Sequence, residues 1–135
     1  MAGVYNWGEL VIERRRTVDY QFTIYQSDGT TGVTLASGDV VRFKAFLEDG
    51  TVVLDLDSVA ATSNGSLVTI DNTTAPARAT VRFAQADVTA MTKPMYFGEL
   101  LVVDDSEESP PDAIKRAAHG KLRMYGSASG DVGKT

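Results

Sequence analysis

Residues 95–125, MYFGELLVVDDSEESPPDAIKRAAHGKLRMY, contain two apolar runs on either side of an acidic tip with two prolines. The second run has an apolar and a polar face, made by Ile114, Ala118, Leu122 and Met124 against Lys115, His119, Lys121 and Arg123. A period of two is the mark of a strand with one buried face. Pro110 and Pro111 cannot donate to a strand ladder, so the tip should lie outside the sheet. The stretch therefore predicts a long β-hairpin, which needs a second sheet to cover its apolar face.

The same alternation recurs earlier in the chain. Residues 41–47 and 52–57 flank the pair Asp49-Gly50, and Asp-Gly between alternating runs is a strong hairpin signal. Further strands are predicted at residues 18–24, 67–70 and 79–83. The segment 84–91 breaks the period of two and predicts one helical turn between sheets, with Asp87 as a candidate cap at Val88.

About seven short strands and one short helical turn are typical of an all-β fold. We expect an immunoglobulin-like β-sandwich, with a closed barrel as the alternative. The 135 residues suffice for one domain. The predicted parts are an N-terminal arm and possible edge strand at 1–16, the β-sandwich domain at 17–125 and a flexible C-terminal tail at 126–135.

Composition excludes several classes of function. The net charge of −5 argues against nucleic-acid binding, which favours a basic face. The chain has no cysteine, so it has neither disulfides nor thiolate metal sites, and this is compatible with synthesis in the cytoplasm. No apolar run approaches the ~20 residues of a membrane span, and the N-terminus does not read as a secretory signal. We therefore expect no membrane and no nucleic-acid partner.

No arrangement of residues predicts catalysis. His119 is the one histidine and falls within a predicted strand, so we interpret it as a sheet-face residue. The acidic residues 104–108 lack the spacing of a calcium loop and are interpreted as a solvated tip. The aromatic residues expected to face the core are Tyr20, Phe22, Phe43, Phe83 and Phe97. The sequence thus predicts a protein that is not an enzyme and holds no cofactor and no metal.

The N-terminal segment supplies the candidate protein-contact residues, which are Trp7, Leu10, Ile12, Arg14, Arg15 and Arg16. The apolar residues can form an edge strand that pairs with a neighbouring subunit, as can residues 33–35, or they can pack on the chain's own sandwich, which we favour. The three arginines form the densest basic cluster, which we interpret as a salt-bridging contact to a partner protein or a solvated loop.

The order of these pieces resembles a known family. An alternating strand ends in a DG-type turn (YQFTIYQSDGTTG), and VTLASGD leads to VVRFKAFLEDGTVVLDLDS. Then follow GSLVTI, ARATVRFAQADVTAM, MYFGELLVVDD and HGKLRMYG. Residues 17–125 are in this respect similar to the immunoglobulin-like β-sandwich domain of tailed-bacteriophage virion proteins, and to the N-terminal domain of siphophage baseplate upper proteins.

The resemblance implies a non-enzymatic structural protein of the virion, a baseplate or tail adaptor or accessory component. It also implies other virion proteins as partners, and a homo-oligomer or symmetric assembly. Baseplate upper proteins continue into an adaptor region, whereas this sequence ends at Thr135, which keeps a capsid decoration (cement) protein on the head as an alternative. A carbohydrate or host-surface binding module is the alternative from another class, with Tyr5, Trp7, Tyr25, Tyr96 and Tyr125 as candidate anchors.

Overall fold

The computed structural model describes residues 5–24, 35, 39–71, 73, 77–103 and 114–125. Within them the chain forms eight strands and one short helix. In order they are β1 (Tyr5–Glu13), β2 (Val18–Thr23), β3 (Val40–Phe46), β4 (Val52–Asp57), β5 (Leu67–Asp71), β6 (Arg78–Phe83), α1 (Gln85–Thr89), β7 (Met95–Val103) and β8 (Ile114–Tyr125). The strands predicted from alternation correspond to β2 to β8, and the possible edge strand in the first 16 residues is β1.

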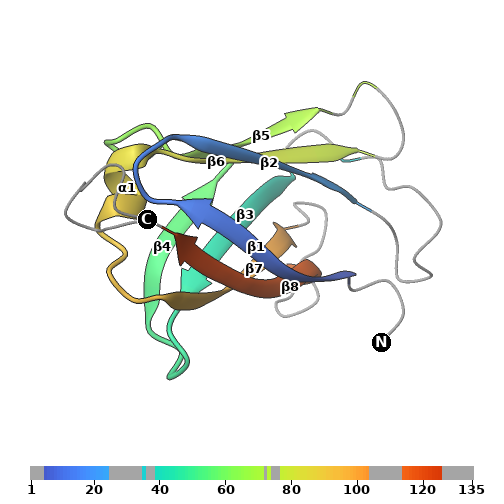
Figure 1. The fold of residues 1–135 in the computed structure, drawn as a ribbon. Coiled ribbons are helices and arrows are strands. Elements are labelled where there is room, and N and C mark those ends of the chain that lie inside the picture. Colours follow the sequence, from blue (N-terminus) through green and yellow to red (C-terminus); the bar gives the residue numbers. More distant parts are fainter. Residues whose placement is uncertain are drawn as a thin grey trace.

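The strands form two sheets that pack face to face (Figure 1). The large sheet has the order β1-β8-β7-β3-β4 and the small sheet the order β2-β6-β5. The edge strand β1 runs parallel to β8, and the other pairs are antiparallel. The order β8-β7-β3 opposite β2-β6-β5 corresponds to strands G-F-C opposite B-E-D of an immunoglobulin domain, with β4 in the place of C′. The all-β sandwich is therefore confirmed.

The corner before β7 has a second immunoglobulin feature. Tyr96 is buried near the start of β7, and its hydroxyl accepts a hydrogen bond from the backbone N–H of Lys93 at 3.0 Å. In the same corner the N–H of Met124 donates to the carbonyl of Pro94 at 2.9 Å. A tyrosine that bonds back to the backbone just upstream is the tyrosine corner of immunoglobulin sandwiches, which fixes the crossing from one sheet to the other.

The hairpin of β7 and β8 has the predicted antiparallel pairing, but one face of β7 differs from the prediction. Tyr96, Gly98 and Leu100 point into the core, whereas Phe97 lies half-buried on the outer face beside Phe46. Nearly all residues of β7 are apolar, so alternation alone does not show which set is inside. The bond between Tyr96 and Lys93 selects the face, and the expected inward position of Phe97 was wrong.

The predicted hairpin of β3 and β4, with its turn at Asp49-Gly50, is confirmed. Gly50 in the turn has φ +92°, a conformation that residues with a Cβ rarely adopt. Leu54 and Leu56 are buried, whereas Val52, which belongs to the same alternating set, is 48% exposed. A β-bulge shifts the register beyond Ala45 and places Val52 opposite the outward Phe46.

Aromatic rings from both sheets form the centre of the core. Phe43 of the large sheet and Phe83 of the small sheet are fully buried and meet edge to face, with ring centroids 5.3 Å apart. Phe22 packs 6.3 Å from Phe43, and Tyr20 packs 6.4 Å from Phe83. Four of the five aromatic residues predicted to face the core thus do so. Offset and edge-to-face pairs of this kind add about 0.5–1.5 kcal/mol beyond the buried area.

Candidate protein-contact site

Trp7 lies inside the fold rather than on an arm. Its ring packs 5.2 Å from Phe22 and 5.9 Å from Phe43, centroid to centroid, so it joins the aromatic core. Its indole Nε1 donates a hydrogen bond to the backbone carbonyl of Lys121 on β8 at 2.9 Å. A packed indole N–H needs such a partner, and here the partner is the strand that β1 pairs with. Trp7 thus attaches the N-terminal strand to the sandwich.

Two glycines make the space for the indole. A Cβ on Gly120 would lie 2.6 Å from Cε2 of Trp7, and one on Gly98 would lie 3.1 Å from Cζ2 of Trp7 and 2.8 Å from Phe43. Gly98 and Gly120 face each other across β7 and β8. Together they form a slot in the large sheet that only residues without a side chain can leave open.

The other apolar contact candidates also face inward. Ile12 has no exposed surface, and Leu10 packs against the core. The side chains next to them on β1, those of Glu9 and Val11, are exposed, because side chains alternate across a strand. Glu9 forms an ion pair with Arg123 of β8 at 3.5 Å. The expected packing on the chain's own sandwich is found, and contact with a neighbour through this strand stays a prediction.

Arg14 has a structural role, because it bonds to several segments of the chain. It is 7% exposed, and its guanidinium donates to the carbonyls of Met91 at 2.9 Å and Lys93 at 2.6 Å. Its backbone N–H donates to the carbonyl of Tyr125 at 2.9 Å, and its own carbonyl accepts from the hydroxyl of Thr89 at 2.8 Å. The residue therefore joins the turn after β1 to α1, β8 and the segment before β7. No sequence pattern indicates this role, because the acceptors are carbonyls far along the chain.

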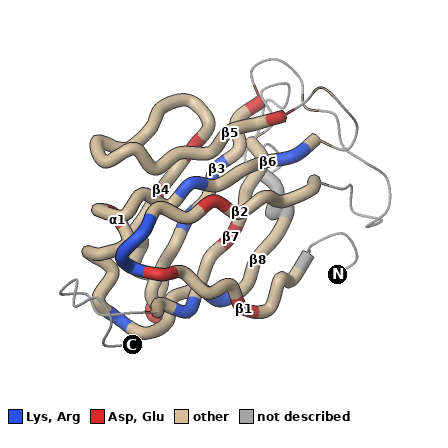
Figure 2. The backbone as a smooth tube through the Cα atoms, turned by 45° about the horizontal axis from the view of Figure 1, so that its top comes forward, with Lys and Arg blue, Asp and Glu red and all other residues tan. Residues whose placement is uncertain are grey.

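The three arginines form the blue turn between β1 and β2 in Figure 2, but the surroundings of their side chains differ. The side chain of Arg16 is 71% exposed, 3.8 Å from Glu13. The side chain of Arg15 is 9% exposed and 3.7 Å from the same carboxylate, and its Nε and Nη1 are buried with no hydrogen-bond partner among the described residues. Of the three, Arg16 is the one placed as the solvated contact residue that the sequence predicts.

Asp87 connects the helix to the loop before β5. Its carboxylate accepts from the hydroxyl of Thr62 at 2.7 Å, from the amide of Asn64 at 2.7 Å and from the hydroxyl of Ser66. Burial by itself raises the pKa of Asp87, but the bonds from Asn64, Ser66 and Thr62 together lower it below the ordinary value. The predicted cap was wrong: α1 begins after Ala84, whose side chain does not cap it, and Asp87 is used for this tertiary connection.

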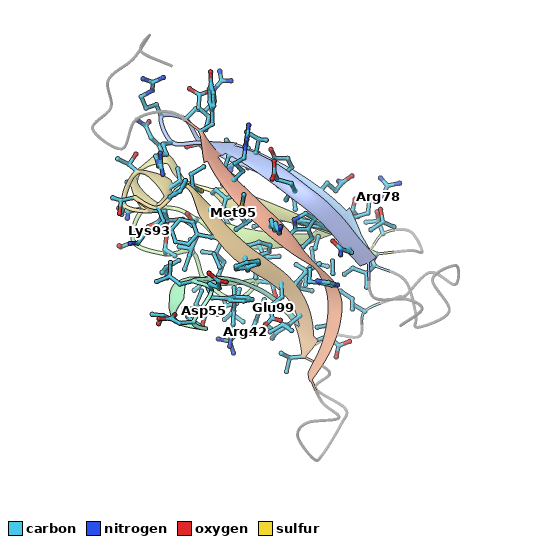
Figure 3. The ribbon with its side chains drawn as sticks, turned by 60° about the horizontal axis from the view of Figure 1, so that its bottom comes forward. Arg42, Asp55, Arg78, Lys93, Met95 and Glu99 are labelled. Atoms are coloured by element: carbon cyan, nitrogen blue, oxygen red, sulfur yellow. The ribbon has the colours of Figure 1, made fainter. Side chains whose placement is uncertain are left out.

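The large sheet has five strands and the small sheet three, so the large sheet has the wider outer face (Figure 3). This face consists of the side chains of the large sheet that point away from the small sheet, and two rows of them run across β4, β3, β7 and β8. Residues opposite each other in the register form rows across it: Asp55, Lys44, Glu99 and His119, then Val52, Phe46, Phe97 and Lys121. His119 is a sheet-face residue, as predicted. Among the residues that the structure describes, no strand or helix covers this face.

The outer face of the small sheet carries an ion pair between two of its strands. Asp19 of β2 and Arg82 of β6 form a two-pronged ion pair with distances of 2.9 and 3.0 Å. The hydrogen bond from Arg82 lowers the pKa of Asp19, and the same bond raises the pKa of Arg82. Both side chains are exposed, so water and salt screen the pair and its contribution to stability is small.

Neither a metal centre nor a membrane helix is found in the described part of the chain. No three His, Asp or Glu residues of that part lie where they could together hold a metal ion. No helix in it is long and apolar enough to cross a bilayer. No family model matches the sequence, and no curated protein matches it.

Proposed function

We propose that this chain is a non-enzymatic structural protein of a tailed-phage virion, a baseplate or tail component that acts through protein–protein contacts. The proposal rests on the resemblance of residues 17–125 to virion domains, and the immunoglobulin-like strand order is compatible with it. The observation that supports it most is the outer face of the large sheet. That face combines a stacked pair of aromatic rings with a neighbouring row of charged side chains, as in an interface that has an apolar part and a polar rim.

The strands that carry this face are held in place by the packed core, which supports a contact role. Beneath the face, the buried rings of Phe43 and Phe83 fill the core. Trp7 bonds β1 to β8, and Arg14 bonds the turn after β1 to the segment before β7. A surface held by packed strands loses little conformational entropy on binding, so more of the contact energy remains as affinity. A structural subunit in a repeated assembly needs such a preformed surface.

The test is the location of the protein. Virions of the phage that encodes the chain are purified, their proteins are identified by mass spectrometry, and a cryo-electron microscopy map is calculated. We expect the chain in stoichiometric amounts, with sandwich-shaped density on the baseplate or tail. Density on the head surface instead would assign the capsid decoration role. Virions that lack the chain would overturn the proposal.

The glycan-binding alternative finds less support in the side chains. Of its candidate anchors, Trp7 and Tyr96 are used in the core and the corner, and Tyr125 is 45% exposed on β8. Tyr25 and the side chain of Tyr5 lie outside the described part. A row of exposed rings, the usual platform for sugars, is thus not formed by the described anchors.

A further inference from the structure

The charged row on the outer face of the large sheet alternates in sign from strand to strand. Asp55 of β4 lies opposite Lys44 of β3, Lys44 opposite Glu99 of β7, and Glu99 opposite His119 of β8. Across the sheet the row is minus, plus, minus and then an imidazole. Asp55 also pairs with Arg42 at 2.7 Å, so its charge is partly balanced within its own sheet. Lys44 and Glu99 are the two central members of the row, on the neighbouring strands β3 and β7.

The next row supplies an apolar pair two residues away, at the end of β3 and near the start of β7. Phe46 and Phe97 stack with their centroids 6.2 Å apart and an interplanar angle of 25°. Both rings are half-buried, with Val52 on one side and Lys121 on the other. A stacked aromatic pair on two neighbouring strands, beside charged side chains, is the arrangement of an interface with an apolar part and a polar surround.

If the row of one copy is reversed and placed against the row of another, the central positive charge of each copy meets the central negative charge of the other. A two-fold axis that lies between β3 and β7, parallel to these strands, would place each row on the same row of a second copy, reversed. Lys44 would then face Glu99 of the second copy, and Phe46 would face Phe97. We infer that the outer face of the large sheet packs against the same face of a second copy of this chain. The inference goes beyond the proposed contact role and rests on it only for its place in a virion.

The row also determines where the axis lies. An axis centred on β7 would bring Glu99 against Glu99 of the second copy, and one centred on β3 would bring Lys44 against Lys44. Like charges placed together at an interface cost several kcal/mol, so both shifted arrangements are disfavoured. With the axis between the two strands, the four central charges form a closed ring of opposite signs. Aligned sheet packing, in which the strands of the two sheets run within about 30° of each other, accommodates this nearly parallel contact.

The test uses the purified full chain and two single charge reversals, Lys44→Glu and Glu99→Lys. The mass of each protein is measured by analytical ultracentrifugation over a range of concentrations. We expect the unchanged chain to be a dimer and each single variant to dissociate at least about 100-fold more readily, because it places like charges opposite each other. An unchanged chain that stays monomeric at 100 µM, chosen as roughly 100 times a 1 µM Kd, would overturn the inference.

Mixing the two variants gives the decisive measurement. Positions 44 and 99 are both acidic in the Lys44→Glu variant and both basic in the Glu99→Lys variant. In a mixed pair each acidic position of one protein faces a basic position of the other, so we expect a 1:1 heterodimer from two monomeric proteins. The double variant Lys44→Glu/Glu99→Lys should dimerise again for the same reason.

If neither the mixture nor the double variant dimerises, although circular dichroism shows that all variants are folded, this face is excluded as the dimer interface. Arg82→Glu, on the small sheet, is the matched control and should leave the dimer unchanged. The outcomes also separate this inference from the proposed function. A chain that is present in virions but monomeric in solution would exclude the dimer and leave the virion role intact. A chain that passes the heterodimer test but is absent from virions would leave the dimer and remove the virion role.

Discussion

The indole of Trp7 occupies the space that a side chain on Gly120 would need. A Cβ there would lie 2.6 Å from Cε2 of the ring, far inside van der Waals contact. The ring cannot simply move away, because its Nε1 is bonded to the carbonyl of Lys121, the next residue of the same strand. The two residues come from the first and the last strand of the sandwich, so their fit closes the fold at its parallel edge.

Gly120→Ala should therefore lower the free energy of unfolding by about 1–3 kcal/mol, the usual cost of overpacking a filled site. We expect the cost to be smaller in a Trp7→Ala background, where the ring is gone. Urea denaturation of the four proteins in this double-mutant cycle measures the coupling. Lys121→Ala, one residue further and exposed, is the control and should change stability by less than about 0.5 kcal/mol. If Gly120→Ala lowers the free energy of unfolding equally with and without Trp7, the ring of Trp7 does not fill the space above Gly120.

The alternation of side chains along β1 gives a second prediction. Ile12→Ala should cost about 2–4 kcal/mol of stability, because Ile12 is fully buried. Val11→Ala, on the same strand but 44% exposed, should cost less than about 0.5 kcal/mol. Thermal unfolding of both variants is the measurement. A mild effect of Ile12→Ala would mean that the strand contributes little to the fold and is available as an arm for a neighbouring subunit.

The alternative in which the N-terminal segment pairs with a neighbouring subunit gives a related prediction. An N-terminal arm that binds a neighbour predicts that deletion of residues 1–12 weakens assembly more than folding. The deletion removes Trp7 from the aromatic core together with most of β1, so we now expect it to impair folding itself. A deletion variant that keeps a cooperative thermal transition would restore the arm interpretation.

The hairpins were predictable because their signals are local. Asp49-Gly50 between alternating runs specifies a turn, and the pattern of β8 specifies a strand, without knowledge of the rest of the fold. The inward face of β7 was not predictable, since Tyr96 and Phe97 are both aromatic. What decides between them is a hydrogen bond to the backbone of Lys93, and no pattern of hydrophobicity reports it.

The candidate site was harder to predict for a related reason. The roles of Arg14 and Asp87 depend on acceptors and donors from distant segments, so their charge suggested a solvated contact and a helix cap. The parallel pairing of β1 with β8 joins the two ends of the sandwich and leaves no local signature. The charged row of the outer face likewise becomes visible only when the register of four strands is known.

Arg14 gives a third prediction, based on the two carbonyls to which it donates. Arg14→Lys keeps the charge but cannot reproduce the forked contact to Met91 and Lys93. We expect a loss of about 2–4 kcal/mol, because a buried cation and a buried carbonyl lose partners. Arg16→Lys, at 71% exposure, should be neutral within about 0.5 kcal/mol. Equal effects of the two substitutions in urea denaturation would show that Arg14 acts only through its charge.

The lowered pKa of Asp87 makes part of the stability depend on pH. A carboxyl group whose pKa is lower in the folded than in the unfolded chain stabilises the fold above the unfolded value, near ~4. That contribution disappears as the pH falls below about 4 towards the folded value, because the protonated group can no longer accept all three bonds. Asp87→Asn should therefore cost about 1–3 kcal/mol at neutral pH, since an amide leaves at least one donor unpaired.

The informative quantity is the difference in stability between the unchanged chain and Asp87→Asn at each pH. We expect this difference to be constant from about pH 7 to 5 and to shrink as the pH falls from about 5 to 3, because only the unchanged chain loses its carboxylate. Asn64→Ala removes one of the three donors and should shrink the pH dependence only in part. Asp19, Asp49 and Asp71 also have lowered pKa values, but they are present in all these proteins and cancel in the difference. A difference that stays the same throughout this acidic range would show that Asp87 stabilises the fold by packing and not through its charge.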